Sequence, residues 1–228
     1  MQGFLLVDKP NAISSFGVVA KIRGIIKANI GLKMKVGHSG TLDPEATGLL
    51  ILAVGSYTKK LSVLIKKDKS YELTMKLGQT SSTGDREGII TDVNNEIPSE
   101  KIVKEVLQKF QGDILQTPPA FSAIKVDGKR AYHLARLGKT VELAPRHIQI
   151  FKNELQHYEY PYIRIITDVS SGTYVRSLAQ DIGEELGTGA YVTELRRTRI
   201  GQFNVNQAIK LEDITYAVIC DHLITLEK

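Results

Sequence analysis

A polar loop punctuated by glycine and followed at once by an apolar run most constrains how this chain folds. The loop covers residues 36–48 (Val-Gly-His-Ser-Gly-Thr-Leu-Asp-Pro-Glu-Ala-Thr-Gly), and the run covers residues 49–54 (Leu-Leu-Ile-Leu-Ala-Val). Such a run predicts a buried strand or a short buried helix. Glycine lets the backbone approach a ligand closely, and Pro44 favours an extended conformation at Asp43. Asp43 is therefore either a reactive group at the entrance to a core element or, as is commoner for Asp-Pro, a turn residue or helix N-cap.

The charge distribution indicates an anionic partner. The chain has 228 residues, 42% of them hydrophobic, which is enough for a sizeable core and excludes global disorder. Its formal charge is +5 and its pI about 9.1. Basic residues gather at positions 59–60, 66–69, 125–130 and 196–199. Each cluster alone is explained by a solvated surface, but together they make nucleic acid a serious candidate.

Several function classes lose their usual sequence support. The single cysteine excludes an intrachain disulfide, and the scattered histidines give no zinc-ligand spacing. The chain contains neither a P-loop nor a GxSxG elbow. Apolar runs fall short of the roughly 20 residues that span a bilayer, and the first residues do not resemble a signal peptide. We therefore expect a cytoplasmic protein with no metal and no membrane association.

The order of predicted elements favours an α+β fold around a large mixed sheet, because strands and helices do not alternate regularly. Strands are expected at 3–7, 70–77, 89–93, 147–158, 162–169 and 191–200. Helices are expected after Ser14 or Ser15, at 58–65, after Ser99, and at 131–137, 174–186 and 216–223, with a hairpin at 121–128 turning at Asp127-Gly128. No linker is evident. We expect one domain over residues 1–228, with a lobed insertion at about 115–148.

Several segments, taken in order, resemble the TruB family of tRNA pseudouridine synthases. The loop Gly37–Gly48 resembles the family's catalytic motif. The flanking segments that resemble the family are Phe4–Pro10, Lys69–Tyr71 with Leu77-Gly78, Thr117–Tyr132, Gly172–Arg176 and Leu195–Arg199. Any one segment alone is weak evidence, but their common order over nearly the whole chain is specific.

The resemblance implies a fold and a reaction. It implies the pseudouridine synthase catalytic fold, a mostly antiparallel mixed sheet flanked by helices and loops, with a thumb-like RNA-binding insertion. The implied reaction isomerises uridine 55 in the tRNA T loop to pseudouridine, without a cofactor, after the base has flipped into a pocket. The expected partner is the T arm of tRNA, and the expected state is a monomer. Family members usually continue into a small PUA domain, which is not expected within these residues.

The resemblance makes Asp43 the essential carboxylate. It could act as a nucleophile toward the sugar or base, or as the base that removes a sugar proton, and the sequence leaves both open. Tyr71 would stack on the flipped base, although a strand tyrosine needs no such role. Tyr174 and Arg176 would lie in the pocket, with Arg176 orienting Asp43 through a bidentate pair. The alternative for Arg176 is an ordinary surface arginine.

The remaining expected site residues support the substrate. His38 would occupy space opened by the flipped nucleotide, Lys9 and Pro10 would buttress the pocket, and Leu195 would pack over the target base. For His38 and Leu195 a plain loop or core role also fits. The residues expected to contact RNA phosphates are Lys125, Lys129, Arg130, Arg136, Arg196, Arg197 and Arg199. The last three also fit a solvated, protected edge strand.

Within the loop Gly37–Gly48, two residues depart from the family's pattern. Glu45 stands where an apolar residue is usual, and Ser39 where threonine is common. Glu45 adds negative charge near Asp43.

Two other functions stay open. The basic clusters also suit an RNA-binding factor that helps tRNA to fold. A catalytic subunit of a guide-RNA particle is the third hypothesis.

Overall fold

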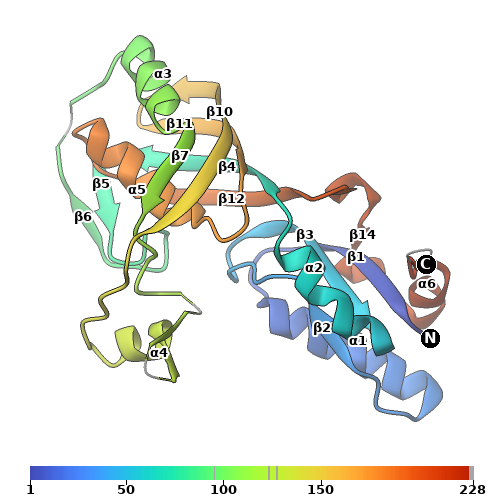
Figure 1. Cartoon of the computed structure of the whole chain (residues 1–228). Helices are drawn as coiled ribbons and strands as arrows, with labels where there is room; N and C mark the ends of the chain where they lie inside the picture. The colour runs from blue at the N-terminus through green and yellow to red at the C-terminus, as the bar shows by residue number, and fades with distance from the viewer. Residues whose placement is uncertain (95, 123, 127, 226–228) are drawn as a thin grey trace. The chain divides into compact units, whose positions relative to one another are not determined.

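The computed structural model describes residues 1–94, 96–122, 124–126 and 128–225 (Figure 1). The chain divides into two compact units. Unit 1 comprises Met1–Tyr71 and Leu195–Lys228, and unit 2 comprises Glu72–Glu194. Strands β4 (Lys69–Leu77) and β12 (Ala190–Ile200) have residues in both. The expected organisation as one domain stays a prediction.

Unit 1 is built on a mixed sheet of order β14-β1-β3-β12. Its elements besides the parts of β4 and β12 are β1 (Gly3–Lys9), α1 (Ser15–Ile30), β2 (Val36–His38), β3 (Thr47–Val54), η1 (Gly55–Lys60), α2 (Leu61–Ile65), β13 (Phe203–Asn204), η2 (Val205–Gln207), β14 (Ile209–Lys210), η3 (Leu211–Asp213) and α6 (Tyr216–Asp221). Strand β1 pairs antiparallel with β3 and parallel with β14, and β3 pairs parallel with β12. Strand β2 lies antiparallel to β3.

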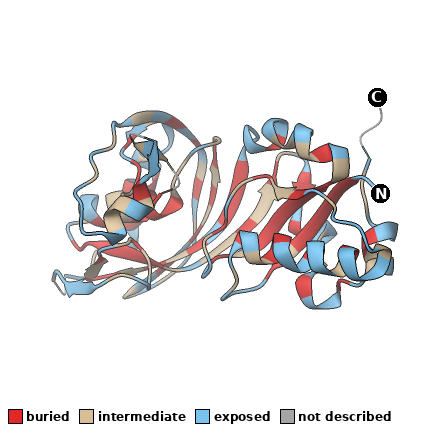
Figure 2. Ribbon diagram, turned by 90° about the horizontal axis from the view of Figure 1, so that it is seen from below, coloured by how far each residue is buried: buried red, intermediate tan, exposed pale blue. Residues whose placement is uncertain are grey.

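Apolar side chains point alternately to the two faces of the strands of unit 1 and form two separate clusters. Leu5 and Leu50 pack with the buried stripe of α1, which includes Val18 and Ile22. Phe4, Leu6, Leu49 and Ile51 belong to the other cluster, together with Tyr57 and Phe203. Successive strand residues point to opposite faces, so both faces of this sheet are covered. Figure 2 shows the burial along these strands, and each large apolar side chain buried there contributes about 1.5–3 kcal/mol.

Helix α1 begins and ends where its local sequence predicts. The Ser14 hydroxyl accepts a hydrogen bond from the Gly17 N–H at 3.0 Å, which caps the N-terminus. Gly31 ends the helix with a φ of 71°, and its N–H donates to the Lys27 carbonyl. That left-handed conformation suits glycine because it has no Cβ.

The strands of unit 2, including its parts of β12 and β4, follow the order β12-β4-β11-β10-β7. Its other elements are β5 (Gln79–Ser81), β6 (Ile90–Asp92), α3 (Glu100–Lys109), β7 (Gly112–Gln116), β8 (Lys125–Val126), β9 (Lys129–Arg130), α4 (Ala131–Arg136), β10 (Arg146–Glu159), β11 (Tyr162–Val169) and α5 (Val175–Glu185). Strands β7, β10 and β11 form antiparallel pairs. Strands β8 and β9 form a separate hairpin.

The predicted α+β fold with a mostly antiparallel mixed sheet is confirmed. Residues 36–38, expected within the loop, pair with β3 as β2, and the helix expected at 58–65 is split between η1 and α2. Strands β5 and β7 were not predicted. The hairpin turn was expected at Asp127-Gly128, and Asp127 lies outside the described residues. In the part of the chain that the structure describes, no helix has the length and apolar character to cross a bilayer.

Candidate active site

The Asp43 loop of unit 1 connects β2 to β3 and is tied to its surroundings by its backbone. The Ser39 N–H donates to the Ile51 carbonyl at 3.0 Å, and the Ala46 N–H donates to the Asp43 carbonyl at 3.1 Å. The Ser15 hydroxyl, at the start of α1, donates to the Leu42 carbonyl at 2.9 Å and accepts from the Leu42 N–H at 2.8 Å. Asp43 itself is half-buried. The loop therefore holds a partly accessible carboxylate on a fixed backbone.

Lys9, at the end of β1, is hydrogen-bonded to the same loop. Its side chain is fully buried, and its ammonium donates to the carbonyls of Pro10, Ile13 and Pro44 at 2.8, 2.7 and 3.0 Å. Burial lowers the pKa of Lys9 from 10.5 to about 8, while the negative charges of Asp43 and Glu45 oppose that shift. Lys9 thus joins the segment after β1 to Pro44 of the loop, and it interacts electrostatically with Asp43. The expected buttressing of the pocket by Lys9 stays a prediction.

Arg197 is a second buried cation that contacts the loop. Only 1% of the residue is exposed, and its guanidinium donates to the carbonyls of Leu49, Thr41 and Gly40 at 2.8, 3.4 and 3.3 Å. The expected contact of Arg197 with an RNA phosphate is wrong, because its guanidinium is enclosed by the protein backbone. The reason is that β12 lies between β3 and β4, so it is not the protected edge strand considered above.

The neighbouring arginines of β12 have partners within unit 1. Arg196 forms a bidentate pair with Asp8, with N–O distances of 3.0 and 2.7 Å. Arg199 donates to the Ser70 hydroxyl at 2.8 Å and to the Gly201 carbonyl at 3.2 Å. Both remain partly accessible. Their contact with phosphate stays a prediction, and it would add to these existing interactions.

Four other expected site residues belong to unit 1, namely His38, Pro10, Tyr71 and Leu195. His38 ends β2, and its Nδ1 accepts from the Gly40 N–H at 3.4 Å. Burial lowers the pKa of His38, which favours the neutral ring that such acceptance requires. Pro10 is exposed, Tyr71 is 7% exposed on β4, and Leu195 is partly buried on β12. The expected stacking by Tyr71 and the expected packing of Leu195 over the target base stay predictions.

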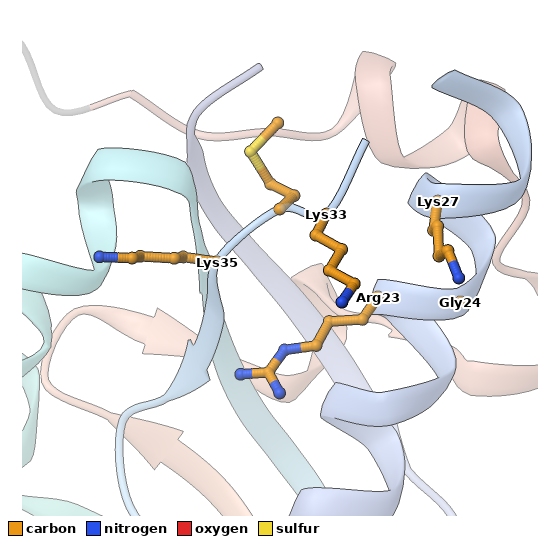
Figure 3. Close-up of a pocket in the computed structure, with 6 residues that line it drawn as sticks. Arg23, Gly24, Lys27, Lys33 and Lys35 are labelled. Carbon is orange, nitrogen blue, oxygen red and sulfur yellow. The ribbon is translucent and has the colours of Figure 1, made fainter. Parts of the chain in front are cut away.

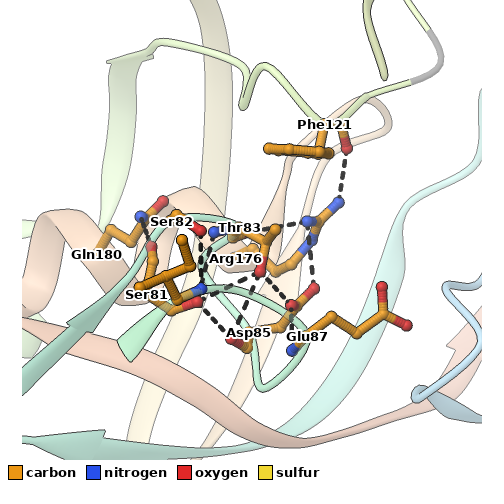
Figure 4. A network of polar contacts seen from close by, with 9 residues as sticks. Ser81, Ser82, Thr83, Asp85, Glu87, Phe121, Arg176 and Gln180 are labelled. Atoms are coloured by element: carbon orange, nitrogen blue, oxygen red, sulfur yellow. Dashed lines mark hydrogen bonds and ion pairs between the residues drawn. The ribbon is translucent and has the colours of Figure 1, made fainter. Parts of the chain in front are cut away.

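In unit 2, Arg176 is the centre of a polar network in the first turn of α5 (Figure 4). It is 8% exposed and lies 3.2 Å from an Asp85 carboxylate oxygen. Its other donors reach the carbonyls of Thr83 and Phe121, each at 2.8 Å. The surface-arginine alternative is therefore wrong. The expected pairing of Arg176 with Asp43 joins residues of different units and stays a prediction.

Asp85 is a residue that sequence reasoning missed. It lies in the polar loop between β5 and β6, where an aspartate is an ordinary turn residue. Its carboxylate accepts from the Thr83 hydroxyl and from the Glu87 N–H, the latter at 3.0 Å, as well as pairing with Arg176. No local signal distinguishes this aspartate from others, because its partner lies far along the chain.

Tyr174 caps α5 and is fixed by two neighbours in unit 2. The Gln116 side chain accepts from the Tyr174 N–H at 2.8 Å and donates to the Tyr174 carbonyl at 3.0 Å. The Arg146 guanidinium lies 4.7 Å from the centre of the Tyr174 ring and also donates to the Gly172 carbonyl. These contacts order the segment 172–176 and leave the Tyr174 ring partly accessible.

The basic residues expected in the thumb are all exposed. Lys125 and the pair Lys129-Arg130 lie on the β8–β9 hairpin, and Arg136 ends α4 next to the ring of Tyr132. Their placement suits contact with a phosphate backbone. Among the residues described, no group of three or more His, Cys, Asp or Glu side chains could hold a metal ion. The chemistry available in the Asp43 loop is that of a carboxylate beside buried cations.

The sequence of this chain is similar to those of known proteins. Residues 26–175 match the profile described as TruB family pseudouridylate synthase (N terminal domain), and residues 176–224 match that of the tRNA pseudouridylate synthase B C-terminal domain. The curated tRNA pseudouridine synthase B of Clostridium acetobutylicum is 41% identical over 228 residues, covering 100% of this chain and 77% of the relative. That of Aquifex aeolicus is 44% identical over 216 residues, covering 93% and 73%.

A solved structure shares the fold. A chain of a Cbf5–Nop10–Gar1 complex aligns with a TM-score of 0.74 at 31% identity, covering 96% of this chain and 55% of that one. This chain thus spans about half the length of that solved chain. The sequence profile alone covers more than half of the residues here, and the curated relatives exceed 40% identity over most of their own length. This chain belongs to the TruB family of pseudouridylate synthases.

Proposed function

We propose that this chain isomerises uridine 55 in the T loop of tRNA to pseudouridine, and that Asp43 is the essential carboxylate. The observation that carries the proposal is the Asp43 loop itself, a half-accessible carboxylate on a backbone fixed by the buried cations Lys9 and Arg197. The family assignment and the name shared by the curated relatives support tRNA as the substrate.

The reaction breaks the bond between the sugar C1′ and the base N1 and forms a bond between C1′ and C5. The C5 hydrogen leaves as a proton to solvent, and N1 takes up a proton, so that the product is an isomer of uridine. Asp43 either attacks as a nucleophile or removes a sugar proton. In both cases the carboxylate must be ionised and held toward the flipped nucleotide. The negative charge of Asp43 acts against the lowering of the Lys9 pKa by burial, so the two groups interact electrostatically. We propose no cofactor for this reaction.

Residues of both units would hold the RNA. Tyr71, Tyr174, His38 and Leu195 are proposed to line the space for the flipped base. The exposed thumb cations at Lys125, Lys129, Arg130 and Arg136 are proposed to contact phosphates, together with the accessible parts of Arg196 and Arg199. We propose that the protein acts as a monomer in the cytoplasm.

The isomerase proposal is tested by release of tritium from C5-labelled uridine in a T-arm transcript. We expect the wild type to release tritium and Asp43→Asn to release none above background, whereas Glu45→Gln, a matched change in the same loop, retains activity. An inactive wild type or a fully active Asp43→Asn variant would contradict the proposal. Because the chain is also similar to a subunit of a solved multiprotein complex, activity on bare tRNA also excludes an obligate guide-RNA particle.

The tRNA-folding alternative is tested with the same variant. If Asp43→Asn accelerates tRNA folding and restores growth of a cell lacking the wild-type protein, RNA folding is the function under selection. We expect growth to require Asp43.

A further inference from the structure

A second basic surface lies in unit 1, away from the Asp43 loop, and we propose that it binds the phosphate backbone of the substrate RNA. Here we call it the α1 pocket. It has a volume of about 560 Å³ and is lined by Arg23, Gly24, Lys27, Lys33, Met34 and Lys35. Figure 3 shows that Arg23 and Lys27 come from α1, and Lys33 and Lys35 from the segment that follows the helix.

The α1 pocket carries positive charge without acidic neighbours in its lining. All four of its basic residues are exposed. The sequence contains no aspartate or glutamate between Asp8 and Asp43. Within the described part of the chain, the side chains of Lys33 and Lys35 form no ion pair and no hydrogen bond. Four like charges around one hollow repel each other, and an anion bound among them relieves that repulsion.

The structural roles of these side chains account for only part of the cluster. Lys27 lies in the last turn of α1, where its charge offsets the negative end of the helix dipole. Arg23 donates to the Val36 carbonyl at 2.5 Å and lies 5.8 Å from the centre of the Phe16 ring. Neither role involves Lys33 or Lys35. Stabilisation of the end of α1 therefore does not explain Lys33 and Lys35, whereas binding of an anion does.

The register of the sheet places Lys35 and the end of the Asp43 loop at opposite ends of β3. Lys35 directly precedes β2, whose Val36 pairs with Val54 at the far end of β3, whereas the Asp43 loop enters β3 at Thr47. The eight residues of β3 span about 24 Å at roughly 3.4 Å per residue. At the roughly 3.4 Å rise of B-form DNA that distance equals about seven base pairs. An A-form RNA duplex rises less per base pair and needs more of them to cover it.

This spacing favours an RNA longer than an isolated arm. An RNA stem of about five base pairs rises by less than roughly 17 Å, the value for B-form DNA, which is shorter than β3. We infer that the α1 pocket contacts a part of full-length tRNA that a minimal T-arm stem-loop lacks. This inference rests on the proposed function in that it takes tRNA as the bound RNA.

The test compares two RNAs and two matched double variants. Lys33→Gln/Lys35→Gln removes two charges from the α1 pocket, and the control Lys101→Gln/Lys104→Gln removes two exposed charges from α3. Binding is measured by filter retention of a full-length tRNA transcript and of a T-arm stem-loop over a series of salt concentrations. Tritium release from the stem-loop is measured in parallel.

We expect the pocket variant to bind full-length tRNA about 3–10-fold more weakly, with a salt slope lower by about 1–2, because each lost phosphate contact lowers the slope by roughly 0.9. We expect its binding and turnover of the stem-loop to match the wild type. Unchanged tRNA binding, an equal loss on both RNAs or an equal loss in the control variant would overturn the proposal. Absence of tritium release from the wild type would instead contradict the proposed function, and the binding comparison would still decide the role of the α1 pocket.

Discussion

Arg197 lies opposite Gly48 where β12 pairs in parallel with β3, and a Cβ added to Gly48 would stand 2.3 Å from the Arg197 carbonyl oxygen. Gly48 also has a φ of +99°, a conformation that other residues rarely adopt. The last glycine of the loop is therefore required by a strand that follows it by more than a hundred residues. The same strand supplies the guanidinium that holds the loop.

Gly48→Ala should destabilise the protein by about 3 kcal/mol, because the clash is with backbone and the strands must separate to relieve it. The measurement is the free energy of unfolding in urea. Gly24→Ala is the control, since an added Cβ at this helical position meets nothing within 4 Å and should stabilise by about 0.5–1 kcal/mol. Equal stability of the two variants would show that β12 and β3 do not approach as described.

Arg197→Met should lower the free energy of unfolding by about 2 kcal/mol and turnover at least tenfold. The reason is that the backbone carbonyls of Gly40, Thr41 and Leu49 lose their hydrogen-bond donor. RNA affinity should change little, since this guanidinium is enclosed by protein. Unfolding, tritium release and tRNA binding are measured together. Arg196→Met, which removes a more exposed pair with Asp8, is the comparison. A large loss of affinity without a loss of stability would argue for phosphate binding by Arg197.

The lowered pKa of Lys9 has a consequence for stability at high pH. The group has a pKa of about 8 when folded against 10.5 when unfolded, so the unfolded chain binds more protons between these values. Stability from this group therefore rises as pH increases through that window. The rise in unfolding free energy from pH 8 to pH 10 should be about 1–2 kcal/mol larger in the wild type than in Lys9→Met.

Lys21→Met serves as the control for that comparison, because Lys21 donates to the Leu211 carbonyl from the surface of α1. It should show the wild-type dependence on pH. A Lys9→Met profile parallel to the wild type would show that Lys9 does not lose its proton in this range. Burial also lowers the pKa of Lys69 to about 8. Because Lys69 is present in all three proteins, its contribution to the pH dependence of stability is the same in each and cancels in the comparison.

Asp85→Asn should destabilise the protein by about 2–3 kcal/mol, because Arg176 would keep a nearly buried charge without its carboxylate partner. We also expect reduced turnover, since Arg176 would lose one of its constraints. Unfolding and tritium release are measured for this variant and for Glu72→Gln, an exposed residue of β4 in the same unit. Indistinguishable variants would show that the ion pair does not fix Arg176.

Local sequence determined the elements whose signals lie within a few residues. Helix α1 follows from the Ser14 cap, the apolar stripe through Val18 and Ile22, and the glycine at its end. Helix α3 follows in the same way from Ser99, whose hydroxyl accepts from the Ile102 N–H. The Asp43 loop and the buried run after it were evident because glycine, proline and an apolar stretch act over short range. The family resemblance supplied the expected roles.

Only the tertiary structure decided which side chains face protein and which face solvent. The basic pattern at 195–199 suggested surface arginines, yet β12 is an inner strand and Arg197 is buried against carbonyls of the loop. Asp85 looked like a turn residue until its contact with Arg176 was known. Both results depend on strand order and on partners distant in sequence. A charge pattern along one strand cannot reveal them, because burial is set by the neighbours that the fold brings to it.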